Sequence, residues 1–384
     1  MGKRIFRTKL CDLLGIDYPI LSAGMGPSLI GEKTGAPVEL VVAVSEAGGL
    51  GVLGAAGFTV EGMQDHIREI KKQTDKPFGV DLLLPRVIVE AGDQPFEKGA
   101  TYALSDIIKT LPGKHLDFIL KVQKEMRLPE LTSNSAAGST ITRPHEAVRV
   151  CIEEKVPLFC SGLGNPGFMV KDAHAAGIKV LGISGNTKNA RRIAQSGADL
   201  VVAQGHEGGG HTGRIGSMAL WPQAVDAAAP TPLLAAGGIG DGRGVAAALA
   251  CGCVGVWVGT RFLASKEGGA LPIQKQTIVE ATDEDTRRSY LYTGKTSRSI
   301  YNQMHDLWEN SGLDPLPFPQ QVFFASALAE MFNTAQMKEF MGPFSGQVSG
   351  LIKEIKPAAI ILEEMVEAAA DILTRKLPED VIIK

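Results

Sequence analysis

The chain has 384 residues, of which 44% are hydrophobic and 21% are charged, and its net charge is −3. This composition is typical of a globular protein with room for one large domain and an appendage. It argues against a nucleic-acid partner, because phosphate binding needs clustered Lys and Arg. No apolar stretch reaches the roughly 18 residues of a membrane helix, and no signal-peptide core follows Lys9. Five cysteines form no CxxC pair, which favours reduced thiols. We therefore expect a cytoplasmic protein without a membrane partner.

From Tyr18 to about Leu263, short apolar runs alternate with amphipathic helical patterns, several of which end in glycine. The apolar runs predict strands at Pro19–Ala23, Gly51–Ala55, Phe78–Leu83, Leu158–Ser161, Val180–Ser184, Leu200–Gln204, Leu233–Ala236 and Val254–Val258. Strands separated in this way by helices predict an α/β fold with a parallel sheet. Eight such units over about 250 residues favour a closed (β/α)8 TIM barrel, with an open doubly wound sheet as the alternative.

Two regions interrupt this repeat. Residues 86–142 form an insertion after the third strand, at the face where barrels carry their sites, and it is either a lid or a packed surface excursion. Residues 266–384 lose the βα rhythm and are predicted to be mostly helical, for example at Ala325–Phe332 and Ala358–Arg375. We expect residues 1–265 to form the barrel, and residues 266–384 to form a C-terminal helical extension packed on it.

Glycine-rich segments follow the last two predicted strands, at residues 235–245 and 258–262. Backbone N–H groups in such a loop, together with a helix N-terminus, form an anion site. The loops after strands seven and eight often bind phosphate in barrels of this kind. Together the two segments predict a phosphate-bearing ligand, although each alone is a weak signal.

A third glycine-rich segment, residues 204–214, contains His206, Glu207 and His211. The two histidines are five residues apart across three glycines, and no further Cys or His lies nearby, so we expect no metal site. Three glycines allow close approach to a flat ligand, while His211 offers a group that titrates near neutrality. A loop histidine that only hydrogen-bonds a carbonyl is the alternative for His211 and the favoured interpretation for His206.

The segment from Gly49 to Gly54 matches the GxGxxG dinucleotide fingerprint, but its position is wrong for that function. The fingerprint must follow a strand and open a helix. Here it follows the predicted helix that ends at Ala47 and runs into a strand. We therefore reject a Rossmann site.

Several motifs resemble those of the nitronate monooxygenase family, whose relatives include flavin-dependent enoyl-acyl-carrier-protein reductases and certain quinone reductases. The motifs are Pro19-Ile-Leu-Ser-Ala-Gly-Met-Gly, Val44-Ser-Glu-Ala-Gly-Gly-Leu-Gly, the loop from Gln204 to His211, Ala236-Gly-Gly-Ile, Gly259-Thr-Arg-Phe-Leu, Tyr292-Thr-Gly-Lys with Arg298 and Asn302, and Ser345-Gly-Gln-Val-Ser-Gly. The resemblance spans nearly the whole chain except residues 86–142.

This resemblance implies FMN at the carboxyl-terminal mouth of the barrel, with His211 as the catalytic residue. The residues that it assigns to the cofactor are Ala23, Gly24, Met25, Asp81, Gln204, Gly209, Gly210, Gly237, Gly238, Gly259 and Thr260. Asp81 stands where the family commonly has Asn, and Trp257 where it commonly has Gln. Asp81 can accept a hydrogen bond from the flavin ring but cannot donate one unless it is protonated.

The function implied by the resemblance is the oxidation of small alkyl nitronates with O2 to carbonyl compounds and nitrite. His211 would orient the anion, or remove the α-proton of a neutral nitroalkane. An NAD(P)H-dependent flavin reductase acting on quinones or enoyl thioesters is the first alternative, and a non-catalytic flavin or phosphate-ligand binder is the second. A catalytic role should make His211 necessary for turnover and dispensable for FMN binding. The sequence leaves both a monomer and a homo-oligomer open.

Overall fold

The structure is a computed structural model, and it describes residues 6–26, 34–93, 102–131, 136–137 and 143–381. The end of the 86–142 insertion, rich in Ser and Thr, lies mostly outside these residues. None of the helices in the described ranges is long and apolar enough to cross a bilayer.

Eight parallel strands form the central sheet, as the sequence predicted. In chain order they are β1 (Ile20–Ser22), β2 (Gly51–Gly54), β3 (Phe78–Leu83), β6 (Leu158–Gly162), β7 (Lys179–Ser184), β8 (Leu200–Gln204), β10 (Leu233–Ala236) and β11 (Gly255–Val258). Their spatial order is β1-β11-β10-β8-β7-β6-β3-β2. A parallel bridge between Leu21 and Leu50 joins the two edges, and the Ser22 amide donates to the Leu50 carbonyl. The sheet is therefore a closed barrel, which confirms the predicted (β/α)8 fold.

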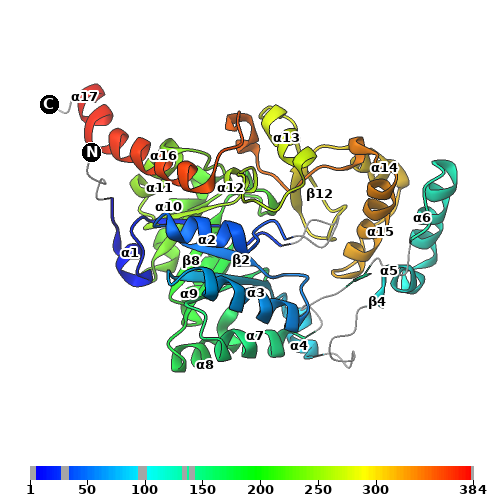
Figure 1. Cartoon of the computed structure of the whole chain (residues 1–384), viewed down its shortest axis with the longest axis horizontal. Helices are drawn as coiled ribbons and strands as arrows, with labels where there is room; N and C mark the ends of the chain where they lie inside the picture. Colours follow the sequence, from blue (N-terminus) through cyan, green and yellow to red (C-terminus); the bar gives the residue numbers. More distant parts are fainter. Residues whose placement is uncertain (1–5, 27–33, 94–101, 132–135, 138–142, 382–384) are drawn as a thin grey trace.

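Helices surround the barrel (Figure 1). They are α2 (Val38–Glu46), α3 (Val60–Gln73), α7 (Pro144–Glu153), α8 (Val170–Ala175), α9 (Thr187–Gln195), α10 (Ser217–Ala228), α11 (Gly242–Ala250), the short α12 (Thr260–Leu263) and α16 (Ala358–Asp371). Helix α16 packs against both α11 and α2, so a helix from the end of the chain completes the outer layer.

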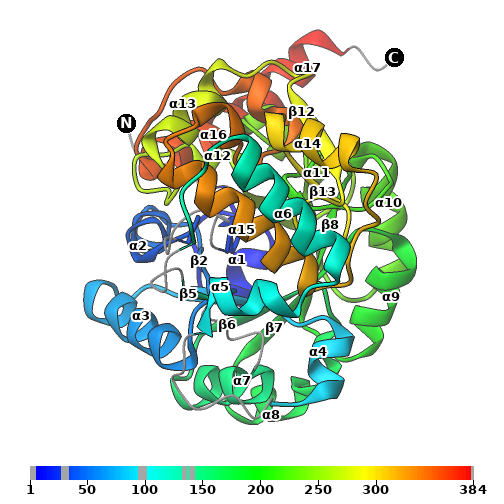
Figure 2. The ribbon, with the colours of Figure 1, turned by 90° about the vertical axis from the view of Figure 1, so that its right-hand side faces the viewer.

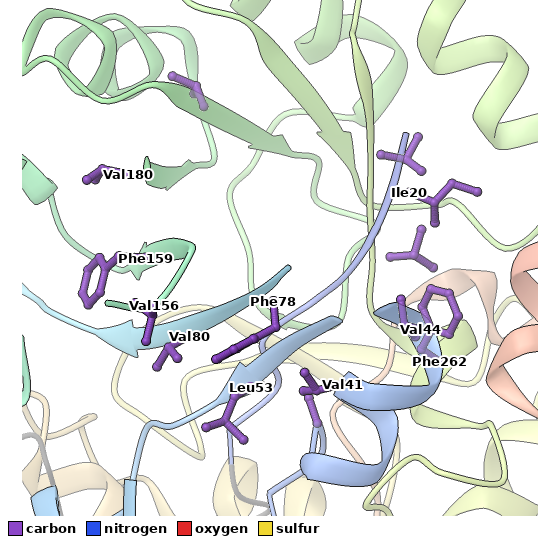
Figure 3. Close-up of a cluster of buried hydrophobic side chains, with 14 of the residues drawn as sticks. Ile20, Val41, Val44, Leu53, Phe78, Val80, Val156, Phe159, Val180 and Phe262 are labelled. Atoms are coloured by element: carbon purple, nitrogen blue, oxygen red, sulfur yellow. The ribbon is translucent and has the colours of Figure 1, made fainter. Parts of the chain in front are cut away.

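Alternate strand residues bury their side chains on opposite faces of the sheet. The outward set packs under the helices, and Figure 3 shows part of it, including Ile20, Leu53 and Phe78. The inward set fills the barrel and is closed at the amino-terminal end by α1 (Lys9–Leu14), which contributes Leu10 and Leu14. Because this end is filled, the free space of the barrel lies at the carboxyl ends of the strands.

The insertion and the last third of the chain share a second hydrophobic core beside the barrel. The insertion contains α4 (Arg86–Ala91), β4 (Tyr102–Ala103), α5 (Leu104–Ile107), the 3-10 helix η1 (Ile108–Thr110), α6 (Gly113–Glu125) and β5 (Ala136–Ala137). The later part contains α13 (Pro272–Glu280), β12 (Thr286–Ser289), β13 (Ser297–Ile300), α14 (Gln303–Ser311), α15 (Gln320–Thr334), η4 (Lys338–Phe340), η5 (Gln347–Leu351), the π-helical turn η6 (Ile372–Lys376) and α17 (Leu377–Asp380). The buried helical residues of the second core come from α5, η1, α6, α14, α15 and η4. Helices α6 and α15 lie side by side in this core (Figure 2).

The strands β12 and β13 were not expected in a region predicted to be mostly helical. They form an antiparallel hairpin, and β13 also pairs with the short strand β9 (Gly210–His211). Their sequences, Thr-Arg-Arg-Ser and Ser-Arg-Ser-Ile, lack the apolar alternation that identifies a strand. The local sequence pattern does not predict these strands, and their formation is explained by the pairing of β13 with β9.

Phe324 at the centre of the second core provides a test of this packing. Its side chain is fully buried and packs edge-on against His115 of α6, with ring centroids 5.5 Å apart. Phe324→Ala should lower the free energy of unfolding by about 3–5 kcal/mol, because it leaves a cavity. Leu120→Ala, at a position on α6 that is 49% exposed, is the control and should cost less than about 1 kcal/mol in the same denaturant titration. Equal effects would contradict a shared core.

Candidate functional site

One large cavity of about 1900 Å³ opens at the carboxyl ends of the barrel strands. Its walls come from the loops after these strands, and residues of α5 and α15 also line it. The barrel and the second core therefore both contribute to the cavity. Every residue that the sequence assigned to the site lines this cavity: Ala23, Gly24, Met25, Asp81, Gln204, Gly209, Gly210, His211, Gly237, Gly238, Gly259 and Thr260. The structure therefore brings together residues that are far apart in the sequence.

The loop after β10 has a backbone that favours glycine. Gly237 and Gly238 have φ angles of +90° and +74°, which L side chains rarely adopt. A Cβ on Gly237 would also approach the Ser217 Oγ to 2.9 Å. Consecutive backbone amides in such conformations form an anion-binding concavity. This loop therefore has the geometry expected of a phosphate site.

Thr260 stands in the neighbouring loop, after β11. Its hydroxyl oxygen accepts a hydrogen bond of 2.9 Å from the amide of Gly346, and its own proton remains available for a ligand. The amide of Gln347 in turn donates to the Glu207 carbonyl at 2.9 Å. The segment Ser345–Gln347 thus ties the loop after β8 to the loop after β11. The motif that begins at Ser345 was recognisable in the sequence, but the sequence alone did not predict that it joins these two loops.

His211 is held in the cavity wall by backbone and side-chain contacts. Strand β9 pairs with β13, with His211 opposite Ser297. The Gln204 side-chain amide donates to the His211 carbonyl at 2.7 Å and to the Gly209 carbonyl at 3.3 Å. Gln204 at the end of β8 therefore fixes the loop that carries the histidine.

The His211 ring also has a defined partner, Thr293. The Thr293 hydroxyl lies 3.0 Å from His211 Nε2, and it donates to the Lys295 carbonyl at 3.2 Å. The hydroxyl has a single proton, so when it donates to the Lys295 carbonyl the ring proton is on Nε2 and Nδ1 is the acceptor. Thr293 and Lys295 belong to the motif that begins at Tyr292, but the motif alone predicts no role for either.

Burial, and then the charge of Lys295, lower the pKa of His211 to about 4. The expectation that this group titrates near neutrality is therefore wrong for the protein without a ligand. At pH 7 the ring is neutral and can accept a proton, while Lys295, which lines the same cavity, supplies positive charge.

Asp81 and Trp257, the two departures from the family pattern, both face the interior of the barrel at its mouth. Asp81 is only 5% exposed, and its Oδ1 has no hydrogen-bond partner among the described residues. Burial raises the pKa of Asp81 well above its ordinary value. A Cβ on Gly24 would lie 2.2 Å from the Asp81 Cβ, so glycine is required where this loop crosses the carboxyl group.

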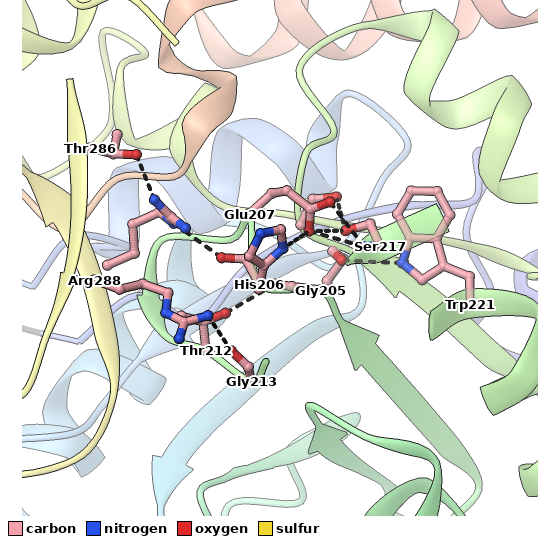
Figure 4. Close-up of polar contacts among 12 residues, drawn as sticks. Gly205, His206, Glu207, Thr212, Gly213, Ser217, Trp221, Thr286 and Arg288 are labelled. Atoms are coloured by element: carbon pink, nitrogen blue, oxygen red, sulfur yellow. Dashed lines mark hydrogen bonds and ion pairs between the residues drawn. The ribbon is translucent and has the colours of Figure 1, made fainter. Parts of the chain in front are cut away.

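His206 and Glu207 hold the loop through polar contacts with neighbouring segments (Figure 4). The Glu207 carboxylate accepts hydrogen bonds from the Ser217 amide and hydroxyl at the start of α10, and it pairs with His206 Nδ1 at 3.1 Å. The His206 carbonyl accepts from the Arg298 guanidinium at 3.1 Å. These contacts agree with the favoured interpretation of His206 as a structural residue.

The lowered pKa of His211 predicts a pH-dependent stability in protein freed of ligand. An unfolded histidine titrates at about 6.5, so between about pH 6.5 and pH 4 the unfolded chain holds a proton that the folded chain does not. The His211 contribution to the free energy of unfolding is therefore lost as the pH falls through this window. His211→Asn removes that contribution, and its stability should fall less between pH 7 and pH 4.5 in urea titrations. Parallel losses in the two proteins would show that His211 is not desolvated.

Comparisons with known proteins agree with this geometry. The sequence model of a family described as nitronate monooxygenase matches residues 7–368. A Mycobacterium tuberculosis protein named "Putative monooxygenase Rv1533" is 35% identical over 380 residues, which cover 95% of this chain and 97% of that protein. A Staphylococcus saprophyticus protein named "Probable nitronate monooxygenase" is 32% identical and covers 96% of this chain and 99% of its own.

Two solved structures share the fold over nearly the full length. The nitroalkane oxidase of Streptomyces ansochromogenes has a TM-score of 0.76 at 27% identity, covering 95% of this chain and 99% of that one. FabK of Thermotoga maritima has a TM-score of 0.72 at 30% identity, covering 98% and 99%. The chain therefore belongs to the nitronate monooxygenase family and is an oxidoreductase of that flavin-dependent type.

Proposed function

We propose that the cavity binds FMN and that the protein oxidises alkyl nitronates with O2 to carbonyl compounds and nitrite. The residues present fit this cofactor. Gly237, Gly238, Gly259 and Thr260 would hold its phosphate, because their loops offer backbone amides and a hydroxyl proton. The unpartnered Asp81 oxygen offers a polar contact for its ring.

When bound, FMN supplies the electron transfer from substrate to oxygen, while the protein supplies position and electrostatics. The observation that carries the substrate assignment is the combination of His211 and Lys295 in one cavity wall. The ammonium group of Lys295 attracts an anion such as a nitronate, and it does so with little solvent screening inside the cavity.

The neutral His211 ring suits both forms of the substrate. With a nitronate it orients the anion, and no proton has to move. With a neutral nitroalkane its Nδ1 takes the proton from the α-carbon, while the Thr293 hydroxyl holds the opposite side of the ring.

An NAD(P)H-dependent reductase acting on quinones or enoyl thioesters is the second candidate. The likeness to FabK supports it, as does the size of the cavity, which extends to Phe318, Val322 and Phe323 at the start of α15. A small nitronate needs only the part of the cavity near His211. The additional apolar length suits a longer substrate or a dinucleotide.

An anaerobic reduction experiment separates the two candidates. Oxidised protein is mixed with propionate 3-nitronate, and separately with NADH and NADPH, while the flavin absorbance is followed. We expect the nitronate to bleach the flavin and the pyridine nucleotides to do so slowly or not at all. Rapid bleaching by NADH with none by the nitronate would contradict the proposal and favour the reductase.

Two variants sharpen this experiment. Lys295→Met keeps the length of the side chain and removes its charge, so kcat/KM for the nitronate should fall by about tenfold or more relative to the neutral nitroalkane. His211→Asn should lose about 10²–10⁴ in kcat/KM for the nitroalkane, because asparagine cannot accept the α-proton. A uniform loss on both substrates in both variants would point to damage of the fold.

A further inference from the structure

Asp81 occupies a place in the cavity where no cation among the described residues pairs with its carboxyl group. On the two strands beside β3, its register partners are Gly54 and Cys160, which offer no side chain and a thiol. Above it the loop after β1 places Gly24 against the carboxyl group. These neighbours bring no cation.

The cavity is also lined by charged and titratable groups from other elements. The lining residues of this kind are His66, Arg86, Glu90, Asp106, Arg192, Glu207, His211, Lys295 and Glu330. None of them forms a described hydrogen bond or ion pair with Asp81, and Glu207 is engaged by Ser217 and His206. Burial also raises the pKa of the Cys160 thiol, so this neighbour is neutral.

A buried carboxylate without a partner costs far more free energy than a neutral carboxylic acid at the same place. Burial raises the pKa of Asp81, and only the backbone amide of Gly162 opposes this shift. A neutral carboxylic acid has one O–H donor and a carbonyl acceptor, the same pair of functions that the side-chain amide of asparagine offers. The ring of FMN carries several hydrogen-bond acceptors and one N–H donor, so it can use both.

We propose that Asp81 serves the cofactor as a neutral carboxylic acid that donates a hydrogen bond, in the way that an amide at this position does. This inference rests on the proposed FMN site, and it deepens the role of one residue in it. Asp81 is a binding residue here, and no proton transfer to substrate is assigned to it.

Infrared spectroscopy tests the protonation directly. The spectrum of cofactor-free protein at pH 7 should contain the carbonyl band of a buried protonated carboxyl group, and this band should be missing from Asp81→Asn. Adding FMN should move the band to lower frequency, because the O–H then donates a hydrogen bond. A wild-type spectrum without the band, or a band that FMN leaves in place, would overturn the proposal.

FMN affinity provides the second readout, by quenching of flavin fluorescence at pH 7. Asp81→Asn retains a donor and should bind FMN within about threefold of wild type, whereas Asp81→Leu keeps the size, removes the donor and should bind about tenfold more weakly. Equal weakening by Asn and Leu would mean that the site needs an anion, and wild-type affinity in the Leu variant would mean that Asp81 gives nothing. Both results overturn the proposal. Neither readout depends on turnover, so a failure of nitronate oxidation is distinguishable from a failure here.

Discussion

The site depends on the pairing of Gly210–His211 with Ser297–Arg298. Strand β9 is only two residues long and follows a run of glycines that has little conformational preference of its own. Its hydrogen bonds to β13, together with the Gln204 amide, fix the backbone that carries the histidine. Thr293, which contacts the ring, and Lys295, which lowers its pKa, come from the turn that leads into β13. One short antiparallel contact therefore joins the barrel to the hairpin and assembles the polar wall of the cavity.

The same contact explains why the later part of the chain matters to a barrel enzyme. The segment Ser345–Gln347 holds two strand-end loops together, and α15 shares its core with the insertion while its first residues line the cavity. The cavity is thus bounded by the barrel on one side and by the second core on the other. His211 and Lys295 lie on the barrel side, whereas Phe318, Val322 and Phe323 lie at or just before the start of α15. We therefore expect the second wall to determine the size of the natural substrate.

The sequence predicted the barrel well because each strand is built around a short, mostly apolar run that is largely buried, with a helix after it. The loops after β8, β10 and β11 could also be predicted, since their glycines mark places where the backbone must approach a ligand or another loop. The hairpin β12–β13 could not be predicted, because its strands are polar and β13 is held by pairing with the distant strand β9. The shared core of α6 and α15 was missed for a similar reason, since no local pattern says which distant helices will pack together.

The protonation states of the site residues also could not be predicted from the sequence. His211 and Asp81 are ordinary titratable residues in a sequence, yet burial shifts the pKa of both toward the neutral form. Desolvation depends on the closed cavity and cannot be deduced from spacing. With His211 neutral at pH 7 and the pKa of Asp81 raised, Lys295 lies in a wall with fewer competing charges than the sequence suggests. This favours an anionic substrate next to a neutral base.

The central claim is that this cavity holds FMN, and the identity of the released flavin tests it most directly. Purified protein is denatured, and the flavin in the supernatant is identified and quantified by chromatography. The account predicts one FMN per chain, and a folded but colourless Gly238→Glu variant, because a carboxylate in that loop repels the phosphate. FAD in the supernatant, or no flavin from correctly folded wild-type protein, would contradict it.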